Sequence, residues 1–224
     1  MPIVKKQHGL IEYFFKGQNP TLLILAGMHG DECEVIDCIF DFSNEHQNSV
    51  PDFLFIPQVS PSAARKKTRK NQWGRDINRC FIDPPVDPEV VDVMAVLKPH
   101  HFSLCLNFHE DPDFQIECYL YDTAGLSEKQ LKTYRSKIRS TGAVLYTGLD
   151  DPLDKDLGLS VTDGYVKTKP ATFSNKAGFS STWLTTHSIV ARVVVPEIPG
   201  KATLSVKKSL VSELFSLFLD PAFS

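Results

Sequence analysis

The stretch TLLILAGMHGDECEVI, residues 21–36, joins an apolar run to a group of polar side chains. The run up to Ala26 is short and rich in Leu and Ile, as in a buried strand, and the residues from Asp31 onward have the apolar spacing of a helix. His29 and Glu32 therefore fall near the turn between the two elements. Because burial of such groups costs free energy unless they have a partner, the stretch predicts a strand, a functional turn and a helix.

The rest of the chain repeats this alternation. Short segments rich in β-branched and aromatic residues, bounded by Gly, Pro, Asn or Asp, predict strands at residues 9–15, 21–27, 53–59, 103–108, 116–122 and 189–195. Apolar residues at helical spacing predict helices at residues 31–46, 88–99, 127–142 and 205–219. This order favours a three-layer α/β/α fold with a mixed, mainly parallel sheet. Residues 144–186 lack sustained periodicity, which indicates either a functional lid or rim or an error in assigning elements.

The composition is that of an ordinary globular protein. The 224 residues are 42% hydrophobic and 23% charged, and we expect residues 1–224 to form a single domain. No apolar segment has the length of a signal-peptide core or a membrane span, so no membrane partner is expected. Five cysteines without a CxxC pair favour reduced thiols and a cytoplasmic location.

One basic run, RKKTRK at residues 65–70, stands out in a chain whose formal net charge is −3. A solvated basic loop would explain its lysines, and the functional alternative is a contact with a polyanion. Because basic residues do not dominate the rest of the chain, we do not expect a nucleic-acid partner.

Polar residues also follow later strands, since His109 and Glu197 each come just after an apolar run. The carboxyl ends of strands in α/β sheets commonly form ligand sites, and a catalytic zinc ion needs about three protein donors. His29, Glu32 and His109 would be a sufficient set. Glu197 would then be free to accept the proton of a metal-bound water. Taken singly, each of these residues also fits an ordinary structural role.

Four motifs together resemble the zinc carboxypeptidase superfamily, which includes murein peptide amidases, succinylglutamate desuccinylases and aspartoacylases. They occur in the family's order: the HxxE metal motif in MHGDE (28–32), the Asn-Arg signature in GRDINRCF (74–81), the later histidine in NFHED (107–111) and the strand of the catalytic glutamate in VVVPEIPG (193–200). Each motif is weak alone, and the ordered set is more specific. The resemblance implies the phosphorylase/hydrolase-like fold of these enzymes.

The resemblance also implies the roles of a catalytic centre. His29, Glu32 and His109 would bind one zinc ion. Glu197 would act as general base and then as general acid. Asp76 would orient a zinc-bound histidine and fix its tautomer.

Further positions would contact the substrate. Arg69 would polarise the scissile carbonyl and stabilise the oxyanion. Asn78 and Arg79 would hold a free carboxylate of the substrate. The tyrosine that reaches over the substrate in many carboxypeptidases has no motif in this sequence, and its candidates are Tyr119, Tyr121 and Tyr165.

These roles predict a zinc-dependent metallocarboxypeptidase-like hydrolase. A zinc-activated water would attack an amide bond adjacent to a free carboxylate, in a small peptide or an acylated amino acid. The spacing from Arg69 to Arg79 resembles that of murein amidases, whereas PSAARKKTR (61–69) resembles the aspartoacylase type. Two alternatives therefore stay open: an N-acyl amino acid deacylase of the succinylglutamate desuccinylase/aspartoacylase type, and a non-catalytic zinc- or peptide-binding relative.

Overall fold

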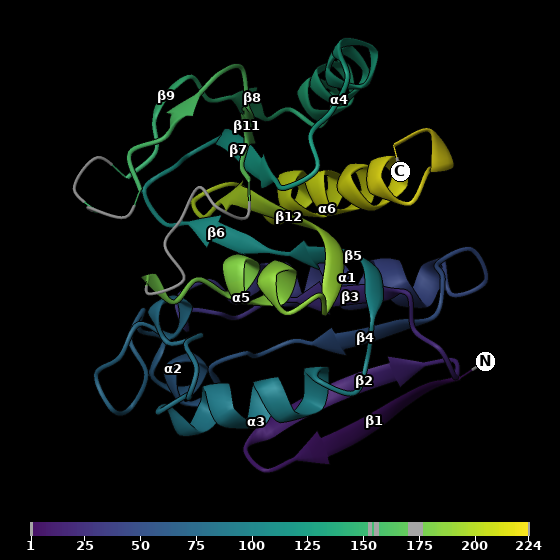
Figure 1. The fold of residues 1–224 in the computed structure, drawn as a ribbon. Helices are drawn as coiled ribbons and strands as arrows, with labels where there is room; N and C mark the ends of the chain where they lie inside the picture. Colours follow the sequence, from purple (N-terminus) through teal and green to yellow (C-terminus); the bar gives the residue numbers. More distant parts are fainter. Residues whose placement is uncertain (1, 152–153, 155–156, 170–176, 224) are drawn as a thin grey trace.

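A mixed β-sheet with helices on both faces forms the framework of the protein (Figure 1). The computed structural model describes residues 2–151, 154, 157–169 and 177–223. In order across the sheet, the strands are β1 (Ile3–His8), β2 (Ile11–Lys16), β4 (Phe53–Ile56), β3 (Leu22–Leu25), β5 (Phe102–Asn107), β12 (Val190–Pro199), β7 (Glu117–Asp122) and β11 (Tyr165–Lys167). Beside β12 and β7 lie the short strands β6 (His109–Asp111) and β8 (Val144–Leu145), and a separate small sheet pairs β9 (Gly148–Leu149) with β10 (Ser160–Val161).

The strands at the centre of the sheet run parallel. β4, β3, β5 and β12 are paired in parallel, whereas β12 and β7 are antiparallel and β1 and β2 form a hairpin at one edge. Helices α1 (Glu34–Glu45), α4 (Glu128–Ser140) and α6 (Leu204–Phe218) pack on one face, and α3 (Pro88–Leu97) and α5 (Ser180–Thr186) pack on the other. The predicted α/β/α class with a mixed, mainly parallel sheet is confirmed.

The central strands bury side chains on both faces of the sheet. In β3, Leu22 and Ile24 pack into one core cluster and Leu23 and Leu25 pack into the other, because successive side chains of a strand point to opposite faces. All four are at most 1% exposed. Two-sided burial explains why this strand is a continuous apolar run in the sequence.

Several predicted elements are shorter in the structure, and two of them show why. The helix expected from residue 31 begins at Glu34, because the residues before it form a turn. The strand expected at 53–59 ends at Ile56, directly before Pro57. Proline has no N–H to donate to a neighbouring strand, so the ladder stops there.

Other elements occur where none was predicted. Helix α2 (Pro61–Lys66) and the 3-10 helix η1 (Ile77–Arg79) lie within the segment around the basic run, and a second 3-10 helix, η4 (Pro221–Phe223), follows α6. The stretch 144–186 contains β8 to β11 and α5, and its residues 152–153, 155–156 and 170–176 lie outside the described part of the chain. Strands of two or three residues are too short to produce a recognisable period.

Two expectations about the chain as a whole can be compared with this structure. None of the helices in the described ranges is long and apolar enough to cross a membrane. All five cysteines are free thiols, and four of them are buried. They are small side chains of the interior, as expected.

Candidate active site

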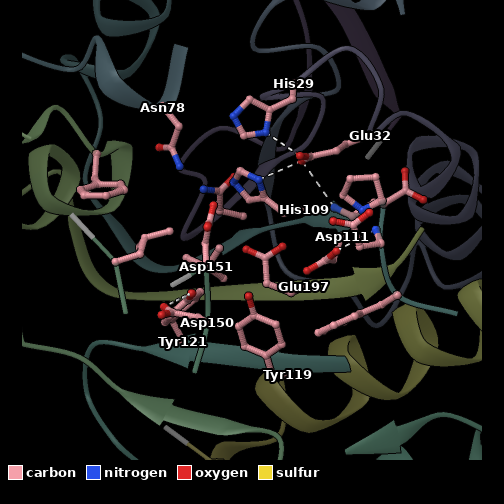
Figure 2. Close-up of a pocket in the computed structure, with 18 of the residues that line it drawn as sticks. His29, Glu32, Asn78, His109, Asp111, Tyr119, Tyr121, Asp150, Asp151 and Glu197 are labelled. Carbon is pink, nitrogen blue, oxygen red and sulfur yellow. Dashed lines mark hydrogen bonds and ion pairs between the residues drawn. The ribbon is translucent and has the colours of Figure 1, made fainter. Parts of the chain in front are cut away.

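Two histidines and a glutamate meet at the carboxyl ends of β3 and β5. His29 and Glu32 lie in the turn between β3 and α1, and His109 begins β6 just after β5. One carboxylate oxygen of Glu32 lies 2.5 Å from Nδ1 of His29, and the other lies 2.9 Å from Nδ1 of His109. All three side chains are buried, and one ligand atom of each lies within 4.8 Å of the others (Figure 2). The structure thus brings the three predicted metal ligands together.

The turn that carries two of these residues is packed tightly against α2. Gly30 donates its N–H to the carbonyl of Thr68 at 2.9 Å. A Cβ at position 30 would lie 2.0 Å from the backbone of Ala63, an approach that only glycine permits. This close packing fixes the turn against the segment that leads to Arg69.

Asp76 links His29 to Arg69. One carboxylate oxygen of Asp76 lies 3.1 Å from Nε2 of His29 and accepts a hydrogen bond from the backbone N–H of Asn78. The other oxygen accepts a hydrogen bond from Nε of Arg69 at 3.1 Å. A carboxylate at Nε2 favours the tautomer that leaves Nδ1 unprotonated in the neutral imidazole. Nε2 of His109, in contrast, is buried and has no hydrogen-bond partner within the described residues.

The charges in this group shift one another's pKa values. Burial disfavours the charged imidazole of His29, but the carboxylates of Glu32 and Asp76 outweigh burial and raise its pKa to about 9. Burial also opposes ionisation of Glu32 and Asp76, yet pairing with histidine holds the pKa of each carboxyl well below its usual value. Both carboxylates are therefore anionic, which is the form that a metal cation attracts.

Glu197 lies beside this group because β12 is paired on both sides. In the strand register, Glu197 is opposite His109 of β6 and opposite Tyr119 of β7. Its carboxylate points toward the histidine and glutamate side chains, and the Tyr119 hydroxyl points toward it from β7 (Figure 2). Burial raises the pKa of Glu197 well above its usual value, and the carboxylates of Glu32 and Asp111 raise it further. A carboxyl in such surroundings is suited to proton transfer.

A cavity of about 430 Å³ opens in front of these side chains. Its wall contains several aromatic residues: Phe114, Tyr119, Tyr121, Tyr146 and Phe179. It also contains four aspartates, Asp111, Asp113, Asp150 and Asp151, and the two arginines Arg69 and Arg79. A cavity of this size with a few polar groups among apolar ones is typical of a site for small molecules.

Part of the sequence is similar to a known catalytic domain, and the fold is similar to those of solved structures. The sequence model of the succinylglutamate desuccinylase/aspartoacylase catalytic domain matches residues 18–91. No curated protein matches the chain. The structure is similar to that of a candidate metallopeptidase from Shewanella baltica OS155, with a TM-score of 0.76, 20% identity, and coverage of 97% of this chain and 85% of that one.

Two further solved structures share the fold. A metallo-carboxypeptidase from Pseudomonas aeruginosa in complex with (2-guanidinoethylmercapto)succinic acid has a TM-score of 0.61 and 18% identity, over 93% of this chain and 60% of that one. A succinylglutamate desuccinylase/aspartoacylase from Rhodobacter sphaeroides has a TM-score of 0.58 and 16% identity, over 93% of this chain and 58% of that one. At such identities these structures establish the fold alone.

The matched segment 18–91 is the one that carries the HxxE turn and the Asn-Arg signature. This part of the chain is similar to the succinylglutamate desuccinylase/aspartoacylase catalytic domain, and the whole described fold is similar to that of the solved structures named above. The similar proteins include a metallo-carboxypeptidase and a succinylglutamate desuccinylase/aspartoacylase. Together with the histidine and glutamate group, the relatives suggest a metal-dependent site.

Asn78 and Arg79 lie on the cavity wall next to α5. The Arg79 guanidinium lies over the Phe179 ring, 4.1 Å from its centre, and forms an ion pair with Asp154. The side-chain oxygen of Asn78 accepts hydrogen bonds from the backbone N–H and the hydroxyl of Ser180. Both predicted carboxylate-binding residues therefore line the same cavity as the histidines.

The three tyrosine candidates differ in position. Tyr119 and Tyr121 line the cavity, and the Tyr121 hydroxyl donates a hydrogen bond to Asp150 at 2.6 Å. Tyr165 points elsewhere, since its hydroxyl donates to the buried Asp122 at 2.9 Å. Its position away from the cavity removes Tyr165 from the candidates for a substrate contact.

Several residues around the site were missed by sequence reasoning. Glu110 and Asp111 directly follow His109 in the motif NFHED, whose acidic residues suggested no specific role. Tyr146 and Ser180 belong to the stretch without periodicity. The only signal for Tyr146 and Ser180 was the length of that stretch, because long segments of this kind often form the rim of a site.

Proposed function

We propose that the protein is a zinc-dependent metallocarboxypeptidase-like hydrolase, with residues 1–224 as one catalytic domain, that cleaves an amide bond adjacent to a free carboxylate. The proposal rests on the buried group of His29, Glu32 and His109 with Glu197 on the neighbouring strand, facing a cavity. Small peptides or acylated amino acids in the cytoplasm would be its substrates. The proposed reaction involves neither a nucleic acid nor a membrane.

One zinc ion would be held by Nδ1 of His29, Nδ1 of His109 and the carboxylate of Glu32. Imidazole nitrogens and a carboxylate are the donors that catalytic zinc sites use, and both Nδ1 atoms already face the one carboxylate. When bound, zinc is a Lewis acid that makes water more acidic and polarises a carbonyl group. Asp76 on Nε2 of His29 would keep Nδ1 available as a ligand.

The protein's own groups would handle the protons and the developing charge. Glu197 would take a proton from the attacking water and return it to the leaving nitrogen. Arg69 lines the cavity, and its Nη1 atom lies 3.8 Å from the Glu32 carboxylate. Its guanidinium would stabilise the negative charge that develops on the carbonyl oxygen during attack.

A free carboxylate of the substrate would be held at Arg79. A guanidinium offers two parallel donors to a carboxylate, and Arg79 already pairs with the carboxylate of Asp154. Asn78, fixed by Ser180, would supply an amide donor beside it. The Pseudomonas aeruginosa metallo-carboxypeptidase with this fold holds a succinic acid derivative, which supports small carboxylates as ligands.

Removal and restoration of the metal test the proposed function. We expect protein stripped of metal to be inactive on cell-wall peptides and on peptides with a free C-terminus, and one equivalent of zinc to restore hydrolysis. The substrate panel must be assayed before and after zinc addition, with the metal content measured in the same samples. Stoichiometric peptide binding without turnover in the zinc-loaded protein would instead identify a non-catalytic relative.

Deacylation of N-acyl amino acids is the second candidate function. It is favoured by the match of residues 18–91 to the succinylglutamate desuccinylase/aspartoacylase catalytic domain. The same metal group and Glu197 would serve it, so the two reactions differ in the substrate that the cavity accepts. N-acylated aspartate and glutamate belong in the same panel, and the substrate class with the larger kcat/KM decides between the candidates.

The Arg79→Ala variant is expected to bind substrate carboxylates poorly. A charge-assisted hydrogen bond contributes about 1.5–3 kcal/mol, so KM should rise about 10–100-fold while kcat changes little. Steady-state kinetics on a peptide and on its C-terminal amide measure the effect, since the amide lacks the negative charge that Arg79 would hold. Arg75→Ala is a control, because Arg75 pairs with Asp87 outside the cavity. An unchanged KM for the free acid would remove Arg79 from this role.

A further inference from the structure

Helix α6 places the ammonium group of Lys207 in the protein interior. The residue is only 1% exposed, and buried lysines are rare unless they are paired. Its Nζ atom donates hydrogen bonds to Glu110 at 2.6 Å, to Glu34 at 2.7 Å and to the carbonyl of Gly200 at 2.7 Å. One ammonium thereby joins α6 to β6, to the start of α1 and to the turn after β12.

Glu110 connects this lysine to the metal group. Its second carboxylate oxygen accepts hydrogen bonds from the backbone N–H groups of Glu34 at 2.8 Å and Val35 at 3.2 Å, the first two residues of α1. The residue before α1, Cys33, gives the helix no side-chain cap, so a carboxylate from a distant strand caps it instead. The backbone N–H of Glu110 also donates to the Glu32 carboxylate at 3.4 Å.

These contacts lie next to two of the proposed zinc ligands in the chain. Glu32 lies two residues before α1, and His109 directly precedes Glu110. Strand β6 has only three residues, and among the described strands it pairs with β12 alone. The ends of α1 and β6 therefore depend on the Glu110 carboxylate for their relative position, and that carboxylate depends on Lys207 for its countercharge.

We propose that Lys207 is a positioning residue for the metal: through Glu110 it holds the start of α1 against β6, and so keeps Glu32 and His109 at ligand distance from each other. This inference rests on the proposed zinc site. Burial opposes the charged form of Lys207, but the carboxylates of Glu110 and Glu34 raise its pKa. The group is therefore an ammonium when it makes these contacts. Lys207 does not line the cavity itself, but its partner Glu110 does.

The test compares Lys207→Met with Lys208→Met. Lys208 is the next residue of α6, is exposed, and pairs with Asp41 at the surface. We expect Lys207→Met to bind zinc at least about tenfold more weakly, the size of effect typical of residues that orient metal ligands, and Lys208→Met to bind as the wild type does. Affinity is measured by competition with a chromogenic chelator at a temperature where the metal-free variants are folded, as judged by circular dichroism.

A second variant covers the case in which Lys207→Met leaves a buried carboxylate that prevents folding. Glu110→Gln/Lys207→Met removes both charges together, which should restore the thermal midpoint of the metal-free protein without restoring zinc affinity. Wild-type zinc affinity in either folded variant would overturn the proposal and would leave Lys207 a purely structural residue. Failure of the wild type to bind zinc, or binding that survives His29→Ala, would instead overturn the proposed function.

Discussion

Hydrolysis by the Glu197→Gln variant is expected to be about 10²–10⁴-fold slower than by the wild type, while zinc binding is unchanged. Glutamine has nearly the shape of glutamate but cannot accept a proton from water. Glu197 also lies outside the buried group of His29, Glu32 and His109 whose ligand atoms are within 4.8 Å of one another. The substitution should therefore separate proton transfer from metal binding.

The surroundings of Glu197 give the physical reason for so large an effect. Burial and the carboxylates of Glu32 and Asp111 raise its pKa, which makes this carboxyl a stronger base than an exposed glutamate. No other carboxyl of the described chain occupies the position opposite both His109 and Tyr119. A neighbouring side chain is thus not placed to replace it.

Single-turnover rates on the preferred substrate, with metal content measured in parallel, check this expectation. Glu117→Gln is a suitable control, because Glu117 begins β7 away from the cavity. A Glu197→Gln variant that keeps zinc and turns over substrate at the wild-type rate would exclude Glu197 as the base. Loss of zinc together with activity would show that Glu197 belongs to the metal site itself.

Replacement of His109 by Ala is expected to weaken zinc binding by about 10²–10⁴-fold. The variant removes one of three protein donors, and a third of the roughly 10–16 kcal/mol found for structural zinc sites is about 3–5 kcal/mol. The loss should extend beyond one bond, because the Glu32 carboxylate lies between both imidazoles and would lose its partner on one side.

Chelator competition on purified variants measures this effect directly, without any substrate. His101→Ala is a matched control, since His101 is exposed and its Nδ1 atom contacts the carbonyl of Ser188 at 2.9 Å, remote from the cavity lining. We expect that control to retain wild-type affinity. Equal zinc affinities for the His109 variant and the wild type would show that His109 is not a zinc ligand.

The framework of the fold could be predicted from local patterns because its central strands are buried on both faces. The apolar run at residues 21–27 corresponds to β3, and the run at 189–195 lies within the longer β12. The positions of His29 and His109 shortly after strands followed from the same patterns, whereas Glu197, also expected just after an apolar run, lies within β12. Their roles in catalysis stay predictions.

The start of α1 illustrates what local patterns cannot reveal. The acidic residues after His29 suit the first turn of a helix, which predicted a start at Asp31. In the structure the helix begins at Glu34 and receives its cap from Glu110, 76 residues away in the sequence. A cap supplied across such a distance leaves no trace in the spacing of neighbouring residues.

The cavity wall was unpredictable for a related reason. Tyr146, Asp150 and Ser180 are placed by short elements and by hydrogen bonds to other segments, such as that from the Tyr121 hydroxyl to Asp150. Each contact joins separate segments of the chain. A propensity of one residue type for strand or helix contains no information about such contacts.

The double pairing of β12 has a consequence for protein engineering. His109, Glu197 and Tyr119 stand in one row across three strands, and their spacing is set by the backbone hydrogen bonds of β6, β12 and β7. The outer wall of the cavity, which includes Tyr146 and Leu149, belongs instead to the short elements that follow α4. The row across the sheet and this outer wall thus belong to different parts of the chain, so residues of the outer wall can be randomised in a library while the row is left intact.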